Sequence, residues 1–283
     1  MAHYYVPDEI QEIADHVGDS FALAKAAKAS DADIIVFCGV SFMGESAKIL
    51  CPDKKVLMPD LTADCAMAHM VAPGKIQAMR EQYEDLAVVC YINSTAELKC
   101  ESDVCVTSSN AVKIVRELPN QNIFFIPDRN LGRYVAEQVP EKNVILNDGC
   151  CPIHAELKAE QLLAAKAAHP DALVLSHPEC EKEILDLSDY IGSTAGIISF
   201  AKNSEAKEFI ICTEDGVAWQ LQTDNPDKKF FFPEPSLCCK DMKLNTLQRL
   251  LAVLENEENE VHVTEDRSSG AMLPLDRMLE LGK

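Results

Sequence analysis

Three cysteines recur at nearly equal intervals along the chain. Cys151 lies 86 residues after Cys65, and Cys239 lies 88 residues after Cys151. Two of the three belong to adjacent pairs, Cys150–Cys151 and Cys238–Cys239, so spacing alone leaves two candidates in each pair. Three thiolates gathered at one centre suit a soft metal, either tetrahedral zinc with an open position or an iron–sulfur cluster with one iron free of protein ligands.

Polar triplets repeat with almost the same period. HYY begins at His3, YIN at Tyr91 and HPE at His177, and the last two follow apolar runs. His3, His154 and His177 can hydrogen-bond or exchange protons near neutral pH. Glu179, in the third triplet, is the best candidate for a general base, a role that favours a carboxylate with a raised pKa.

Hydroxyl side chains near the expected helix starts form a further group that could receive phosphate or carboxylate together with free backbone N–H groups. They are Ser20, Ser41, Ser108, Ser193 and Thr194. The alternative interpretation is that each of these lone histidines and serines at a strand end is structural.

Composition excludes several classes of function. The 283 residues carry a formal net charge of −20, which argues against a nucleic-acid partner because polyanion binding relies on Lys and Arg. No window approaches the roughly 18 apolar residues of a membrane span. The 12 cysteines form no C-x-x-C motif, and those inside apolar runs (Cys38, Cys90, Cys105 and Cys212) are interpreted as buried. We expect a cytoplasmic protein with reduced thiols.

Short apolar runs such as LAVVCYIN and NIFFIPD alternate with amphipathic helical patterns, which predicts an α/β protein with parallel sheets. The repeated cysteines and triplets predict three similar αβα units. The first covers 1–72 and is completed by 255–283, the second covers 73–158 and the third 159–254. Because ligands bind beyond the carboxyl ends of parallel strands, three units can point those ends at one centre.

The first unit is expected to lack its opening strand. An apolar strand precedes the polar triplet in the second and third units, but only Met1 and Ala2 precede His3. A parallel sheet without one strand loses ladder hydrogen bonds and exposes an edge, so we expect this unit to be the least stable.

The motifs of the chain resemble those of the quinolinate synthase A family, which acts in de novo NAD biosynthesis. The matching segments run in order from His3 to about Leu250 and include HYY, DADIIVFCGVSFMGESAKIL, PDLTADCAMA, YINSTAELK, TSSNAVKIV, PDRNLGRYV, GCCPIH, HPEC, GSTAGIISF, TEDG and CCKDMKLNTL. The resemblance implies three αβα units around a pseudo-threefold axis with the active site at the centre, in agreement with the spacing.

The resemblance also implies a cofactor and a reaction. A [4Fe–4S] cluster with one open iron would be held by Cys65, Cys151 and Cys239; the motif register selects Cys151 and leaves Cys150 as a bystander. The enzyme, a transferase, would condense iminoaspartate with dihydroxyacetone phosphate to quinolinate, phosphate and water. An aspartate-oxidising enzyme would supply the unstable iminoaspartate.

Roles for individual residues follow from the same motifs. Glu179 matches the base of a keto–aldo isomerisation, with His177 beside it, and Tyr5 matches a tyrosine of later proton transfers and dehydrations. Substrate-contacting positions are matched by His3, Ser20, Tyr91, Asn93, Ser108, His154, His177, Glu179, Ser193 and Thr194. Two alternatives stay open: a non-catalytic metal- or metabolite-binding relative, because of the missing strand, and a zinc enzyme using the same thiolates.

Overall fold

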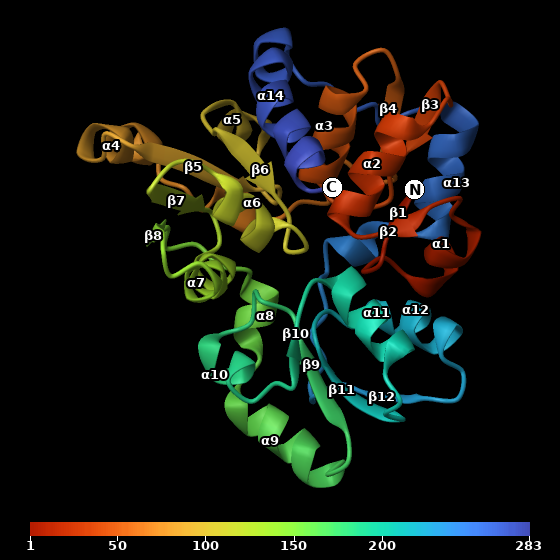
Figure 1. Cartoon of the computed structure of the whole chain (residues 1–283). Helices are drawn as coiled ribbons and strands as arrows, with labels where there is room; N and C mark the ends of the chain where they lie inside the picture. Colours follow the sequence, from red (N-terminus) through yellow and green to blue (C-terminus); the bar gives the residue numbers. More distant parts are fainter.

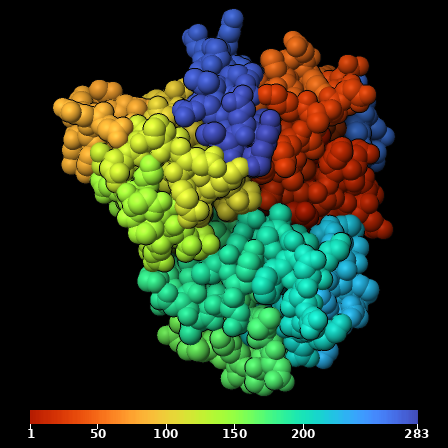
Figure 2. All heavy atoms as spheres, in the orientation of Figure 1, coloured from red at the N-terminus to blue at the C-terminus, as the bar shows by residue number.

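The computed structural model describes the whole chain, Met1–Lys283, as an α/β protein of short parallel strands alternating with helices. The predicted fold class is therefore confirmed. Three groups of strands and helices form three lobes that meet in the middle of the molecule (Figures 1 and 2). A threefold rotational relation between them stays a prediction.

The second lobe contains the best-formed sheet. Its four parallel strands, in the order β6-β5-β7-β8, are β5 (Leu86–Tyr91), β6 (Val104–Val106), β7 (Asn122–Ile126) and β8 (Asn143–Leu146). They are joined by α4 (Lys75–Gln82), α5 (Ala96–Cys100), α6 (Ala111–Glu117) and α7 (Arg129–Gln138). Every residue of β5 is buried, as expected of a continuous apolar strand with both sheet faces covered.

The third lobe repeats this strand order. Its parallel sheet, β10-β9-β11-β12, consists of β9 (Leu173–Ser176), β10 (Tyr190–Ile191), β11 (Glu208–Cys212) and β12 (Lys229–Phe231). Its helices are α9 (Ala159–Ala168), α10 (Lys182–Leu185), α11 (Thr194–Asn203) and α12 (Val217–Asp224), and α8 (Pro152–Glu156) leads into it from the second lobe. In both lobes the first strand lies second in the sheet, next to a later strand on either side.

The first lobe has shorter strands. Two parallel pairs, joined only by a bridge between Ala2 and Cys38, are formed by β1 (Ala2–His3) with β2 (Val17–Gly18) and β3 (Ile34–Val36) with β4 (Lys55–Leu57). Its helices are α1 (Asp8–Ile13), α2 (Ser20–Ala29), α3 (Ser41–Leu50) and the 3₁₀ turn η1 (Ala66–His69).

The opening strand of the first lobe, expected to be missing, is present as the two-residue β1. His3 N–H donates to Cys38 O (3.1 Å), Cys38 N–H donates to Met1 O (2.8 Å), and Tyr4 N–H donates to Gly18 O (3.2 Å). Even two residues of extended backbone thus bond to chain segments on both sides. The first lobe thus has a short opening strand, with β1 shorter than β5 or β9.

The end of the chain returns to the first lobe after the 3₁₀ turn η2 (Met242–Leu244) and α13 (Leu247–Asn256). Val261 N–H donates to Val56 O (2.8 Å), which adds a short antiparallel segment beside β4. The last helix, α14 (Glu265–Leu281), packs against α3, α5 and β6, and Figure 1 shows it beside α3 and α5. No helix is both long enough and apolar enough to span a membrane.

Candidate active site

One cavity collects residues from all three lobes. Of the fourteen residues predicted to bind metal or substrate or to act in catalysis, thirteen line it: His3, Tyr5, Ser20, Cys65, Tyr91, Asn93, Ser108, Cys151, His154, His177, Glu179, Thr194 and Cys239. The exception is Ser193, the N-cap of α11, whose Oγ accepts a hydrogen bond from Gly196 N–H (3.1 Å). Ser41 is also outside the lining, and its hydroxyl donates to Asp64 (2.5 Å).

The strand ends carry the polar triplets to this cavity. His3 closes β1, Tyr91 closes β5, and His177 follows β9 directly. All three strands are parallel to their neighbours, and the cavity lies beyond their carboxyl ends, where open α/β sheets bind ligands.

The three cysteines lie at the starts of short turns or helices, away from regular strands. Cys65 precedes η1, Cys151 is the N-cap of α8, and Cys239 lies three residues before Met242, the first residue of η2. Desolvation raises the pKa of Cys65 to about 12 and that of Cys239 to about 11, and it also raises the pKa of Cys151. Such thiols become thiolates when a cation compensates for the lost hydration, so this donor set fits a metal centre.

The spacing of the sulfur atoms bears on the kind of metal. The Sγ atoms of Cys65, Cys151 and Cys239 do not all lie within 4.8 Å of one another. A single tetrahedral zinc with Zn–S bonds of about 2.3 Å would hold its sulfur ligands about 3.8 Å apart. The wider set suits a polynuclear cluster, which places several atoms between the thiolates.

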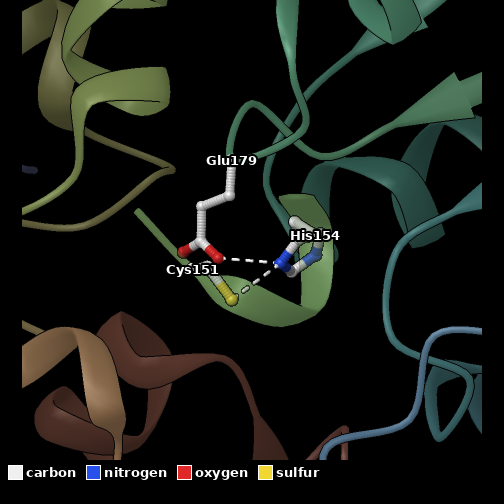
Figure 3. A group of neighbouring side chains, drawn as sticks. All are labelled: Cys151, His154 and Glu179. Atoms are coloured by element: carbon white, nitrogen blue, oxygen red, sulfur yellow. Dashed lines mark hydrogen bonds and ion pairs between the residues drawn. The ribbon is translucent and has the colours of Figure 1, made fainter. Parts of the chain in front are cut away.

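Glu179 lies at the centre of a hydrogen-bonded group that Figure 3 shows in part. Its Oε1 accepts a hydrogen bond from Tyr91 Oη (2.5 Å), and its Oε2 pairs with His154 Nδ1 (2.9 Å), which is also 3.3 Å from Cys151 Sγ. The ligand atoms of Cys151, His154 and Glu179 lie within 4.8 Å of one another. This compact group is the other place in the cavity where a single metal ion would find donors.

The protonation state of Glu179 differs from expectation. Burial favours the neutral acid, but His177, His154 and the Tyr91 hydroxyl outweigh it and lower the pKa of Glu179. The raised pKa expected of this base is therefore wrong. Its cause lies in partners that local sequence around HPE does not reveal.

His177 and His3 occupy equivalent local turns. His177 Nδ1 accepts a hydrogen bond from Glu179 N–H (3.3 Å), and His3 Nδ1 accepts one from Tyr5 N–H (3.2 Å). Burial, as the largest cause, lowers the pKa of each imidazole to about 3. Both rings are neutral at physiological pH, so His177 Nε2–H donates to Ser108 Oγ (3.1 Å).

Tyr5 reaches the same network through a residue that sequence reasoning missed. Its hydroxyl lies 2.6 Å from Thr194 Oγ1 and 2.7 Å from Thr213 Oγ1, and Thr213 Oγ1 lies 2.9 Å from His154 Nε2. Burial raises the pKa of Tyr5 well above its ordinary value, so the phenol keeps its proton. The position of Thr213 directly after β11, in TEDG, was the available signal.

Asn93 presents a free polar atom to the cavity. Its Oδ1 is buried without a hydrogen-bond partner in the chain, which in a lined cavity indicates a place for a ligand or ordered water. No Lys or Arg lines the cavity. Five carboxyl side chains also line it, those of Asp19, Asp64, Glu179, Glu214 and Asp241. Anionic groups entering the cavity would therefore bind through hydroxyls, neutral imidazoles and backbone N–H groups.

The remaining cysteines behave as expected. Cys38, Cys90, Cys105 and Cys212 are buried, which confirms their interpretation as core residues. The bystander Cys150 is half-buried and does not line the cavity.

Comparison with known proteins supports the motif resemblance. A family model described as "Quinolinate synthetase A protein" matches residues 1–280. The chain is 52% identical to "Quinolinate synthase" of Caldicellulosiruptor saccharolyticus, covering 99% of this chain and 93% of the relative. It is 50% identical to the protein of the same name from Clostridioides difficile (100% and 93% covered) and 46% identical to that from Aquifex aeolicus (99% and 89% covered). The chain belongs to the quinolinate synthetase A protein family.

Proposed function

We propose that this protein is a quinolinate synthase, a transferase that condenses iminoaspartate with dihydroxyacetone phosphate to quinolinate, releasing phosphate and water. Family membership and the names of the relatives support the activity. The observation that carries the proposal is that thirteen of the predicted site residues, from distant parts of the chain, line one cavity. Scattered structural histidines and serines would have no reason to converge.

Cys65, Cys151 and Cys239 would hold a [4Fe–4S] cluster. The raised pKa values of the thiols fit ligands of a metal centre of either kind. That the three sulfur atoms do not all lie within 4.8 Å of one another favours a cluster over one zinc on the same cysteines. When bound, such a cluster with one iron free of protein ligands supplies a Lewis acid for carboxylate or hydroxyl groups of the substrate.

Glu179 and Tyr5 would share the proton transfers. Glu179 is ionised at neutral pH and can accept a proton from carbon next to a carbonyl. Tyr5 keeps its proton and can donate it to a leaving hydroxyl. His177, neutral and held by Ser108, would position the substrate beside Glu179.

The substrate anions would be received without Lys or Arg side chains. Ser20 is the first residue of α2, and Thr194 is the first residue of α11, where unbonded N–H groups and the helix dipole favour negative groups. His3, Tyr91, Asn93, Ser108 and His154 add donors and acceptors around the same cavity. Ser193 is assigned to capping α11.

A pseudo-threefold arrangement of units 1–72 with 255–283, 73–158 and 159–254 would explain how the three cysteines meet. The shared strand order of the two four-stranded sheets supports it. An iminoaspartate-producing, aspartate-oxidising enzyme in the same compartment, expected to be the cytoplasm, would supply the substrate.

Quinolinate formation tests the proposal directly. The full-length protein, reconstituted anaerobically with iron and sulfide, should form quinolinate only when both iminoaspartate and dihydroxyacetone phosphate are present, as measured by mass spectrometry. A chain that binds metal but forms no quinolinate would support the non-catalytic alternative. Zinc without iron and sulfide would support the zinc alternative.

A further inference from the structure

Each cysteine loop is attached to the start of a neighbouring helix in the same way. A backbone N–H there donates to the carbonyl oxygen two residues before the cysteine: Ser41 to Ala63 (2.8 Å), Arg129 to Gly149 (2.7 Å) and Asp215 to Leu237 (2.8 Å). These equivalent bonds allow the residues around the three cysteines to be compared position by position.

Two of the three loops have an additional support. Asp128, the residue before Arg129, accepts a hydrogen bond at Oδ2 from Cys151 N–H (3.1 Å). Glu214, the residue before Asp215, accepts one at Oε1 from Cys239 N–H (2.9 Å). The two residues are 0% and 1% exposed, so both carboxyl groups are fully buried. The matching position in the first lobe is Val40.

We propose that Asp128 and Glu214 are positioning residues that fix the backbone of Cys151 and Cys239 and thereby aim their sulfur atoms into the cavity. The inference rests on the proposed function insofar as these cysteines hold the metal. It adds two residues that the motif resemblance did not assign.

Asp128 also connects its cysteine to the candidate base. Its Oδ1 accepts hydrogen bonds from the N–H groups of Asn130 (2.7 Å) and Leu131 (2.8 Å), which fixes the start of α7. The Asn130 side chain then donates from Nδ2 to the backbone oxygen of Glu179 (3.0 Å). One carboxylate thus ties the Cys151 loop to the segment that carries Glu179.

Glu214 makes the corresponding connection to the candidate acid. It pairs with Lys243 Nζ (2.9 Å), and Lys243 Nζ donates to the backbone oxygen of Tyr5 (2.7 Å). Its Oε2 accepts from Gly216 N–H (2.8 Å). The Cys239 loop and the backbone of Tyr5 are therefore held by the same ion pair, of which Glu214 is the buried member.

A carboxylate is required at both positions because each uses both oxygens as acceptors. An amide offers one acceptor oxygen, and its NH₂ group would face an N–H donor. Asp128→Asn and Glu214→Gln therefore preserve shape but break one set of bonds, and leaving a buried N–H donor without its acceptor is costly.

The test measures how fast the full-length, cluster-loaded protein releases iron to a chelator under anaerobic conditions. Asp128→Asn and Glu214→Gln should each release iron about tenfold faster than wild type, or more. The control variants are Asp103→Asn and Asp189→Asn, whose more exposed carboxylates also accept backbone N–H bonds, from Val88 (2.7 Å) and Val174 (2.8 Å), away from the cavity. The controls should stay within about twofold of wild type.

Urea unfolding of each apo-protein is measured alongside, because faster release that only follows lower stability would scale with the fall in the free energy of unfolding across all four variants. If either amide variant fails to fold, Asp128→Glu and Glu214→Asp, which retain both oxygens at shifted positions, should show intermediate release. Release equal to wild type in the variants of Asp128 and Glu214 would overturn this inference alone. A wild-type chain that takes up no iron and sulfide would overturn the proposed function as well.

Discussion

At the residue scale, Glu179 is held between the phenol of Tyr91 and the imidazole of His154. Both partners stabilise the carboxylate, so the group is ready to accept a proton at neutral pH although it is only 3% exposed. A lowered pKa makes the carboxylate a weaker base. Its reactivity therefore depends on the exclusion of water and on a substrate held close to it.

Glu179→Gln should abolish proton acceptance while leaving the cavity shape intact. We expect the rate of quinolinate formation to fall by roughly 10²–10⁴-fold, the usual contribution of a general base, with iron content unchanged. Glu181→Gln is the matched control, because Glu181 is a neighbouring carboxylate that pairs with Arg129 (2.6 Å) outside the cavity. A Glu179→Gln variant as active as the Glu181→Gln variant would contradict the assigned role.

The buried neutral state of His177 has a consequence for stability. Its pKa is about 3 in the folded protein against an ordinary 6.5, so the unfolded chain binds more protons between these values. The contribution of His177 to the free energy of unfolding is therefore complete above pH 6.5. It is lost as the pH falls from 6.5 toward 3, by about 1.4 kcal/mol per pH unit.

Urea unfolding of the apo-protein between pH 6.5 and 5 measures this loss. His177→Asn removes the titrating group, so its free energy of unfolding should fall less steeply with decreasing pH than that of wild type. Parallel slopes for the two proteins would show that His177 is not buried in its neutral form.

At the scale of elements, strand ends and helix starts do most of the positioning. The end of β9 presents His177 and Glu179, while the start of α7 holds both Cys151 and the backbone of Glu179 through Asp128 and Asn130. The start of α7, in the second lobe, thus fixes the position of the segment of the third lobe that carries Glu179.

At the start of α11, the hydroxyls of Ser193 and Thr194 have different roles although they look equivalent in the sequence. Ser193→Ala should remove the N-cap bond to Gly196 and lower the free energy of unfolding by about 1 kcal/mol, with the KM values for both substrates within about twofold of wild type. Thr194→Val is the comparison, since Thr194 lines the cavity and contacts Tyr5. Steady-state kinetics and urea unfolding measure both effects; a large rise in KM for Ser193→Ala would restore it as a substrate contact.

These elements also show where sequence reasoning succeeds. Continuous apolar runs such as LAVVCY predict buried parallel strands because both faces of such a sheet are covered. Regular spacing predicted that His3, Tyr91 and His177 would occupy similar strand ends. Whether Ser193 caps a helix or binds a ligand could not be predicted, because one hydroxyl suits both tasks.

At the scale of the whole molecule, the site exists only where the three lobes meet. Each lobe supplies one cavity-lining cysteine, and the contacts that fix those cysteines join residues far apart in the chain, such as Glu214 with Cys239 and Lys243 with Tyr5. Asp128 and Glu214 are 86 residues apart, close to the spacing of the cysteines, but their residue types differ and the matching position in the first lobe is Val40. Spacing alone therefore did not single them out, and Thr213 has no hydroxyl residue at the matching position of the second lobe, Pro127. Their placement follows from how the lobes pack.

The most direct measurement compares Cys151→Ser with Cys150→Ser in the full-length protein. Both are reconstituted anaerobically, and iron, sulfide and quinolinate formation from the two substrates are measured in the same samples. We predict that Cys150→Ser keeps its cluster and forms quinolinate like wild type, whereas Cys151→Ser loses both. Loss of cluster and activity in Cys150→Ser, with both retained in Cys151→Ser, would contradict the account.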